Sequence, residues 1–187
     1  MKKNIIIVVF VAILVIGLIV GSIMFFKKGD NEEQPQAAIK IETEQDMKDL
    51  IENIYTKVGD QIPNTMTIDV DKEDEFALSS YTGLSNAENI DFIVASEPMM
   101  SSQAYSFVLV KVTDGADVDA IKQEMFDNID TRKWICVSAE KLYVTNSGNL
   151  ICLIMSSSEW ADPVYSEFKN IAGGSLGEEL TRTEAEV

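Results

Sequence analysis

The amino-acid sequence predicts an α+β fold, a mostly antiparallel sheet with packed helices, preceded by one N-terminal transmembrane helix. The first observation is the order of apolar patterns beyond the N-terminal region: helix, strands, helix, strands, helix. The second is a turn rich in asparagine and glycine at 146–149, which makes the two flanking strands antiparallel neighbours. The third is a long apolar run near the N-terminus. The roughly 150 residues beyond this run are enough for one domain with one core.

The apolar run covers residues 5–26 and is interrupted only by two glycines and one serine. As a helix it would span about 33 Å, enough to cross the hydrocarbon core of a bilayer. A cleaved signal peptide is the alternative, with a cleavage site at Val20-Gly21-Ser22. Cleavage there would leave the apolar residues 23–26 at the new terminus, so an uncleaved signal anchor is favoured. No cysteine lies near the anchor, which excludes lipid attachment through a thiol.

Lysine pairs flank the anchor on both sides, at 2–3 and at 27–28. A short N-terminal tail with a large domain on the C-terminal side is typical of a signal anchor that exports the domain. We therefore expect a single-pass protein of the cell membrane, with a cytoplasmic N-terminus and an extracytoplasmic C-terminal domain. Gly17 and Gly21 form a GxxxG pattern, which allows weak self-association of the anchor; two unrelated glycines explain it equally well.

Composition along the chain predicts four regions. Residues 1–28 form the transmembrane signal anchor, and the polar residues 29–42 form a flexible tether. Residues 43–175 form the extracytoplasmic α+β domain, and 176–187 form an acidic, disordered tail.

Four helices are expected within the domain. The first carries one apolar stripe from Met47 to Val58, with Thr43 to cap its start and Gly59 to end it. A short acidic helix is expected within 71–81, ending at Gly83, and a second amphipathic helix runs over 118–129. The last is expected to start at Asp162-Pro163 and to stop at Gly173-Gly174.

Six segments have strand patterns: 65–70, 89–96, 104–113, 133–137, 141–145 and 150–155. The last is apolar on both faces, so we expect it to lie inside the sheet. A four-residue turn at 146–149 would place Cys152 opposite Tyr143. Cys136 would then lie one strand further away, roughly 9–10 Å from Cys152, beyond the 7 Å or so that a disulfide spans. Both cysteines are therefore predicted to be free, buried thiols.

The stretch 89–155 resembles a family of membrane-anchored bacterial domains of unknown function, number four-three-five-eight, from low-GC Gram-positive bacteria. The matching segments, which begin just before that stretch, are Tyr81-Thr-Gly83-Leu84, 96–100 (SEPMM), 108–115 (VLVKVTDG) and 148–155 (GNLICLIM). The resemblance implies an N-terminal membrane anchor or lipid attachment and one unified domain. It implies no activity and no catalytic residues, because the family has none assigned.

Charge and composition exclude several chemistries. The net charge of −16 opposes binding to nucleic acid. The chain has no histidine, which removes Ser-His-Asp and Cys-His nucleophiles and histidine-based zinc sites. The acidic stretch 69–75 resembles a calcium loop but has Asp74 and Ser80 where an EF-hand needs Gly and Glu; a weak, irregular calcium site stays open beside an ordinary helix start.

Two further patterns are candidate sites. Ser138-Ala-Glu-Lys141 and Ser166-Glu-Phe-Lys169 fit S-x-x-K, but the companion motifs of penicillin-binding enzymes are absent. Trp134 and Trp160 are candidates for glycan stacking, although tryptophan is more often core. We therefore assign no catalytic, cofactor-binding or metal-binding residues and expect no cofactor.

The leading hypothesis is a non-enzymatic protein-interaction module at the cell envelope, held by its membrane anchor and binding an envelope protein. A ligand- or cation-binding sensor or carrier that uses residues 69–75 is the alternative. A carboxylate-based cell-wall hydrolase is a weaker one. An apolar cleft with two carboxylates, or a raised carboxyl pKa, would favour the hydrolase; an exposed apolar patch without a cleft would favour the interaction module.

Overall fold

A computed structural model describes residues 38–184 of the chain. The predicted transmembrane helix and most of the predicted tether lie outside these residues. Within the described range, every helix is too short or too polar to cross a bilayer. The predicted α+β class is confirmed for this range, which holds one six-stranded antiparallel sheet and four α-helices.

The sheet has the strand order β1-β2-β3-β5-β4-β6, and every neighbouring pair is antiparallel. Its strands are β1 (Thr65–Asp69), β2 (Ile90–Pro98), β3 (Tyr105–Val112), β4 (Lys141–Ser147), β5 (Leu150–Ser156) and β6 (Leu180–Thr183). All residues of β3 and β5 are buried, because both strands lie inside the sheet with helices over both faces. The prediction that residues 150–155 form an interior strand is confirmed.

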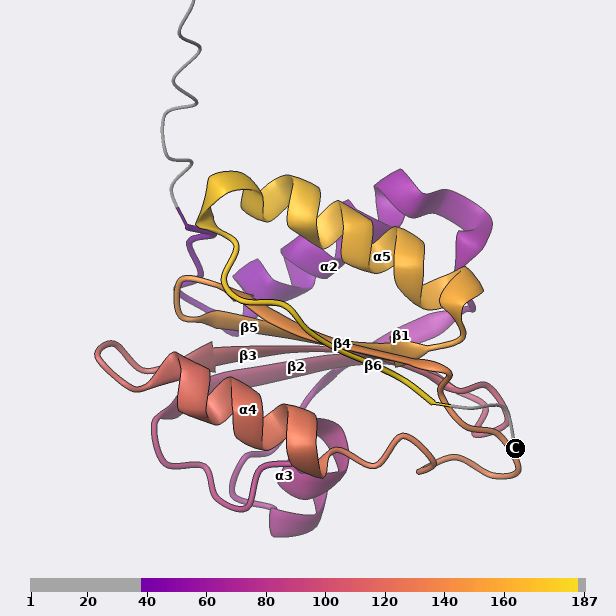
Figure 1. The fold of residues 1–187 in the computed structure, drawn as a ribbon, viewed down its shortest axis with the longest axis horizontal. Coiled ribbons are helices and arrows are strands. Elements are labelled where there is room, and N and C mark those ends of the chain that lie inside the picture. The colour runs from indigo at the N-terminus through magenta and orange to yellow at the C-terminus, as the bar shows by residue number, and fades with distance from the viewer. Residues whose placement is uncertain (1–37, 185–187) are drawn as a thin grey trace, which may run out of the picture. The chain divides into compact units, whose positions relative to one another are not determined.

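Helices cover the two faces in pairs, as Figure 1 shows. Helices α2 (Glu44–Val58) and α5 (Ser158–Ala172) lie on one face, and α3 (Glu75–Thr82) and α4 (Val118–Asn128) lie on the other. The short 3-10 turns η1 (Gly59–Gln61) and η2 (Gly173–Ser175) follow α2 and α5. Side chains alternate along each strand, so the sheet separates two apolar cores, one under each helix pair.

The start of α2 agrees closely with the sequence prediction. Thr43 accepts a hydrogen bond from the Asp46 backbone N–H, and the Asp46 carboxylate accepts the Thr43 backbone N–H, a capping box. Gly59 ends the helix at φ 62°, where a side chain would be strained. The domain nevertheless begins before its predicted first residue. Ile41 is buried in the core, so the end of the predicted tether belongs to the fold.

The predicted strand at 133–137 is wrong, since this segment is part of the loop between α4 and β4. Cys136 has φ 62°, which breaks an extended chain. Lys133 holds the loop instead, donating to the Glu97 carboxylate at 2.6 Å and to the Ser80 carbonyl at 3.0 Å. Apolar residues in a short segment therefore resembled a strand without pairing as one.

The turn between β4 and β5 has two residues, Gly148 and Asn149, rather than the predicted four, because Ser147 pairs with Leu150. Cys152 therefore faces Thr145 and not Tyr143. Both cysteines are free, as predicted, but only Cys152 is buried; Cys136 is exposed on its loop.

Helix α5 starts at Ser158, four residues before the predicted start at Asp162, and Pro163 lies in its second turn. The Glu140 carboxylate accepts hydrogen bonds from the Ser158 backbone N–H and hydroxyl, and so supplies a cap that is distant in sequence. These bonds favour the ionised carboxylate and lower the pKa of Glu140.

The predicted disordered tail is also corrected. Leu180–Thr183 form β6, which pairs with β4 at one edge of the sheet. The buried Lys122 ammonium of α4 binds the Glu178 carbonyl at 3.1 Å, the Asn146 side-chain oxygen at 2.9 Å and the Asp119 carboxylate at 2.9 Å. This lysine ties the C-terminal segment to the domain.

Candidate functional site

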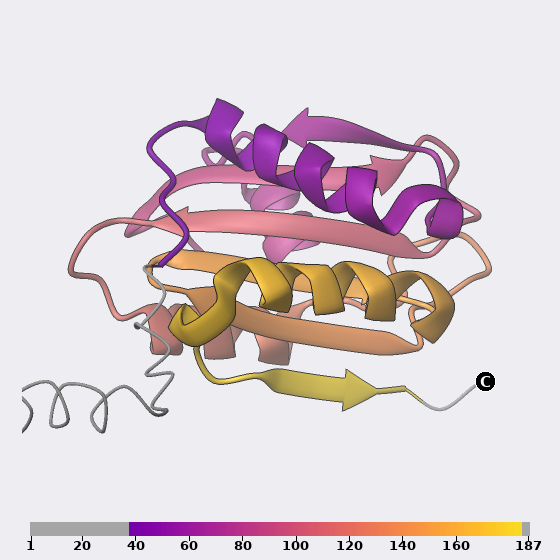
Figure 2. The same cartoon turned by 90° about the horizontal axis from the view of Figure 1, so that it is seen from above.

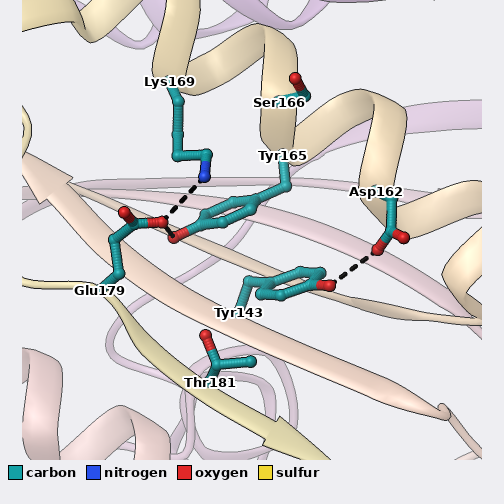
Figure 3. A pocket seen from close by; sticks show the side chains of 7 residues that line it. All are labelled: Tyr143, Asp162, Tyr165, Ser166, Lys169, Glu179 and Thr181. Carbon is teal, nitrogen blue, oxygen red and sulfur yellow. Dashed lines mark hydrogen bonds and ion pairs between the residues drawn. The ribbon is translucent and has the colours of Figure 1, made fainter.

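A hollow of about 300 Å³ lies where α5 meets the edge of the sheet. Helix α5 lies over β5 and β4 but does not cover β6. Figure 2 shows β6 to one side of the helix, at the edge of the sheet. The step between helix and edge strand forms the hollow. Its lining residues are Tyr143, Asp162, Tyr165, Ser166, Lys169, Glu179 and Thr181 (Figure 3).

Two tyrosine rings form the back of the hollow. Tyr143 from β4 and Tyr165 from α5 stack with centroids 4.3 Å apart and planes 4° from parallel. Tyr165 is buried, whereas Tyr143 is partly exposed. One face of the Tyr143 ring is covered by Tyr165, so its exposed surface lies on the other side and at its edge.

Each phenol donates a hydrogen bond to a different carboxylate. Tyr165 Oη donates to Glu179 at 2.6 Å, and Tyr143 Oη donates to Asp162 at 2.7 Å. Lys169 adds a cation to the first pair, with its Nζ 3.1 Å from Glu179 and 4.8 Å from the centroid of the Tyr165 ring. Figure 3 shows the two phenol–carboxylate pairs on opposite sides of the stack.

The electrostatics of the hollow favour neutral phenols beside an ionised carboxylate. The hydrogen bond from Tyr165, together with the smaller effect of Lys169, lowers the pKa of Glu179. Burial, aided by the bond to Asp162, raises the pKa of Tyr143 to about 12, and burial with the bond to Glu179 raises the pKa of Tyr165 further. A general acid of a glycosidase needs a raised carboxyl pKa, and Glu179 departs from that requirement.

The Ser166-Lys169 pattern lies on the rim of this hollow. No hydrogen bond joins the two side chains, since within the described range Lys169 contacts Glu179 and the Tyr165 ring instead. In the other S-x-x-K match, Lys141 donates to the Thr183 hydroxyl. Neither arrangement supplies a serine held by a lysine base, which that chemistry requires.

The acidic stretch around Asp69 forms a helix start. Asp74 accepts the backbone N–H groups of Phe76 and Ala77 as the N-cap of α3. Asp69 pairs with Lys48 at 2.7 Å. Among residues 38–184, no group of three cysteine, aspartate or glutamate side chains is arranged around a metal position.

The two tryptophans are half-buried at the edges of the two cores. Trp160 packs against the core under α2 and α5, and Trp134 packs against the other. The Lys133 ammonium lies 5.5 Å from the Trp134 ring centroid and 4.8 Å from that of Tyr81. Both tryptophans therefore have structural contacts.

A second surface feature is a set of exposed apolar residues at the end of the sheet where β3 and β4 begin. We call it the loop-end patch; it consists of Met99 and Met100 from the β2–β3 loop and Ile135 and Val137 from the α4–β4 loop. Met99 is 83% exposed, Ile135 66% and Met100 60%. The two loops are joined by a hydrogen bond of 3.0 Å from the Ile135 backbone N–H to the Ser101 carbonyl.

Of the residues that line the hollow, the sequence marked only Ser166 and Lys169 as a candidate site, and it did so for a different chemistry. Tyr143, Tyr165 and Glu179 form no motif, because they come from a strand, a helix and the segment before an edge strand. Of the loop-end patch, Ile135 and Val137 fell in the wrongly predicted strand 133–137, and only Met99 and Met100, within 96–100, fell outside the predicted helices and strands. Their signal is the placement of two apolar residues in a loop, where apolar side chains are costly unless they are used.

Comparisons with known proteins bring no identification. No family model matches the sequence, no curated protein matches it, and no solved structure matches the fold. The resemblance of residues 89–155 to a membrane-anchored bacterial family stays a prediction.

Proposed function

We propose that this protein is a membrane-anchored, non-enzymatic module that binds an envelope protein through the loop-end patch. The observation that carries the proposal is the exposure of four apolar side chains in two loops that are bonded to each other. Single exposed apolar residues are ordinary, but a group of them at one end of a domain is typical of an interaction surface.

Hydrogen bonds hold the loops that carry the patch. This supports a docking surface better than it supports apolar residues exposed without a role. Lys133, next to Trp134 and two residues before Ile135, is held by Glu97 of β2 and by the carbonyl of Ser80 in α3. Ser106 of β3 donates to the same Glu97 carboxylate at 2.6 Å. A preformed surface loses less conformational entropy when a partner binds.

The charge of the domain supports a particular kind of partner. Four lysines and four acidic residues lie outside 38–184, so the described residues carry the whole net charge of −16. A second copy of this domain, which has the same negative charge, would be repelled. The occupant that fits is a protein surface with an apolar centre and basic residues around it.

The position of the patch agrees with an anchored module. The described chain enters beside the β4–β5 turn, where the Ile39 backbone N–H donates to the Ser147 hydroxyl at 3.0 Å. The loop-end patch lies at the opposite end of the sheet (Figure 1). It is therefore directed away from the point where the N-terminal segment joins the domain.

The alternatives receive less support. Of the carboxylates in 69–75 that a cation sensor would use, Asp69 pairs with Lys48 and Asp74 caps α3. The hydrolase would need a carboxylic acid with a raised pKa, and the pKa of Glu179 is lowered.

The test is site-specific photo-crosslinking of the full-length chain in intact cells. A photoreactive residue at Met99 should capture one protein of defined mass. The same residue at Phe76, which is 82% exposed on α3, should not capture it. The substitution Ile135→Asp should abolish capture from position 99, because a charge would be buried in the interface. Equal capture from both positions would contradict docking at the patch.

Orientation in the membrane is tested separately. Protease added to cells stripped of their wall should cut within 29–40 and release the domain, since the domain is proposed to be outside. Digestion only after lysis would overturn the proposed topology and leave the patch to be tested on the cytoplasmic side.

A further inference from the structure

The hollow beside α5 contains two similar halves, and only one of them holds a cation. In the first half, Tyr165 donates to Glu179, and the Lys169 ammonium lies on both the ring and the carboxylate. In the second half, Tyr143 donates to Asp162. Among the described residues Asp162 has no ion-pair partner, and no cation lies over the Tyr143 ring.

The stacking fixes the geometry of the second half. Figure 3 shows Lys169 on the side of Tyr165 that faces away from Tyr143. The order through the stack is therefore the Lys169 ammonium, Tyr165, Tyr143 and then Thr181, the residue of β6 that pairs with Tyr143. An ammonium group on the Thr181 side of Tyr143 would meet a ring and a phenol-bonded carboxylate, as Lys169 does at Tyr165.

We propose that the Tyr143–Asp162 half of the hollow binds a primary alkylammonium group of a ligand. Tyr143 offers the ring face for a cation–π contact, and Asp162 offers the charge. The Tyr143 hydrogen bond occupies one carboxylate oxygen of Asp162 and leaves the other free.

The surroundings fit such a ligand. Ser166 and Thr181 line the hollow and form no hydrogen bond with other described residues through their side chains, so their hydroxyls are available as acceptors. The volume of about 300 Å³ accommodates an alkyl chain behind the ammonium group. The net negative charge of the domain attracts a cation over a longer range.

This inference does not depend on the loop-end patch or on its partner. The ammonium group has two sources, a small free amine or the lysine side chain of a peptide. Both use the same chemistry, and titration with one ligand of each kind separates them.

The test is ¹⁹F NMR of the full-length protein in detergent micelles, with 3-fluorotyrosine at all five tyrosines. It is titrated with cadaverine, a small diamine, and separately with a capped tetralysine peptide. The resonances of Tyr143 and Tyr165 should shift, and those of Tyr55, Tyr81 and Tyr105 should not. A tighter response to cadaverine identifies a small amine as the source, and a tighter response to tetralysine identifies a lysine side chain.

Two matched substitutions on α5 separate a site from general attraction. Asp162→Asn and Glu159→Gln each remove one negative charge from an exposed residue of this helix. Asp162→Asn should weaken binding by about tenfold and Glu159→Gln by less than about twofold. Lys169→Met should strengthen binding, because it removes a competing positive charge and opens the first half.

Two results would overturn the proposal. One is a Tyr143 resonance that responds to neither ligand. The other is an equal loss of affinity in Asp162→Asn and Glu159→Gln, which would mean that only the overall charge attracts the amine. Because both residues are exposed, neither substitution threatens folding.

Discussion

The two faces of the sheet are covered to different extents. Helices α2 and α5 have 15 residues each, whereas α3 has 8 and α4 has 11. The long pair leaves β6 uncovered, and the hollow on this face lies between α5 and that strand. Exposed apolar side chains gather on the other side and at the loop ends, including Phe76 on α3 and Met66, which faces the same side as Ile68 of β1. Both faces hold an apolar core, so they differ in the surface that their helices leave exposed and not in whether they are packed.

The largest expected loss of stability comes from a substitution in the core under α2 and α5. Phe168 of α5 is fully buried, so Phe168→Ala should lower the free energy of unfolding by about 3–5 kcal/mol. Phe76→Ala on the other face deletes a phenyl ring that is exposed to solvent. It should change the free energy of unfolding by less than about 0.5 kcal/mol. Denaturant unfolding of both variants measures the contrast. Similar losses would mean that α3 packs more tightly than its exposure indicates.

The second prediction concerns the lysine that ties the edge strand to the α3/α4 face. Lys122→Met should cost about 2 kcal/mol, because the oxygens of Asn146 and Glu178 lose a charged donor. Lys141→Met, which removes one exposed bond to Thr183, should cost less than about 0.5 kcal/mol. Hydrogen exchange should show faster exchange of the β6 amides in Lys122→Met alone. Unchanged exchange would show that β6 is held by its pairing with β4.

The N-caps of α2 and α3 should stabilise the domain by similar amounts, although the two helices differ in length and lie on different faces of the sheet. Thr43→Ala removes the cap of α2, and Asp74→Ala removes that of α3. Each should cost about 1 kcal/mol, since capping satisfies local backbone N–H groups whatever the helix covers. Unfolding curves of the two variants test this. A much smaller cost for Asp74→Ala would indicate that α3 frays without loss to the domain.

Glu179 in the hollow beside α5 should make the stability of the domain depend on pH. The pKa of Glu179 is lower in the folded protein than its ordinary value, first because Tyr165 donates to it and then because of Lys169. Its contribution is therefore present above the ordinary carboxyl pKa and is lost as pH falls through the folded-state pKa. The stability difference between the wild type and Glu179→Gln should shrink as pH falls through this range. When both proteins also carry Tyr165→Phe, this stability difference should change less with pH, because the main hydrogen bond to Glu179 is absent.

The two cysteines compare an exposed loop with a buried strand by their chemical reactivity, without a substitution. Exposed Cys136 should react with maleimide in the native protein, and Cys152 should react only after denaturation, since burial also raises the pKa of its thiol. Mass spectrometry of the protein alkylated after denaturation, without reduction, should find two modified cysteines. An intact disulfide between them would contradict the separate positions of Cys136 on an exposed loop and Cys152 in a buried strand.

Local patterns predicted much of the fold, and two of the errors, at the start of α5 and in the tail, share one cause. The capping residue Thr43, the helix end at Gly59 and the interior strand at 150–155 depend on neighbours along the chain. The start of α5 depends on Glu140, and the order of the tail depends on Lys122, both far away in sequence. Neither contact leaves a periodic signal.

The hollow was not predictable for the same reason. Ser166 and Lys169 are recognisable in the sequence as a spaced pair, but their neighbours Tyr143 and Glu179 come from β4 and from the segment before β6. Only the packing of α5 against the edge of the sheet brings them together. Met99 and Met100 were visible in the sequence, and their exposure at the same end of the sheet as Ile135 was not.

By itself the sequence determined the α+β class, the apolar N-terminal run, the acidic charge and the lack of histidine chemistry. These properties depend on composition and on periods of two or 3.6 residues, which act over short distances. The tertiary structure alone decided the sheet order, the register that pairs Cys152 with Thr145, the place of β6 and the two halves of the hollow. Those features arise from contacts between distant segments, where packing and a few buried polar bonds select one arrangement among many with similar local patterns.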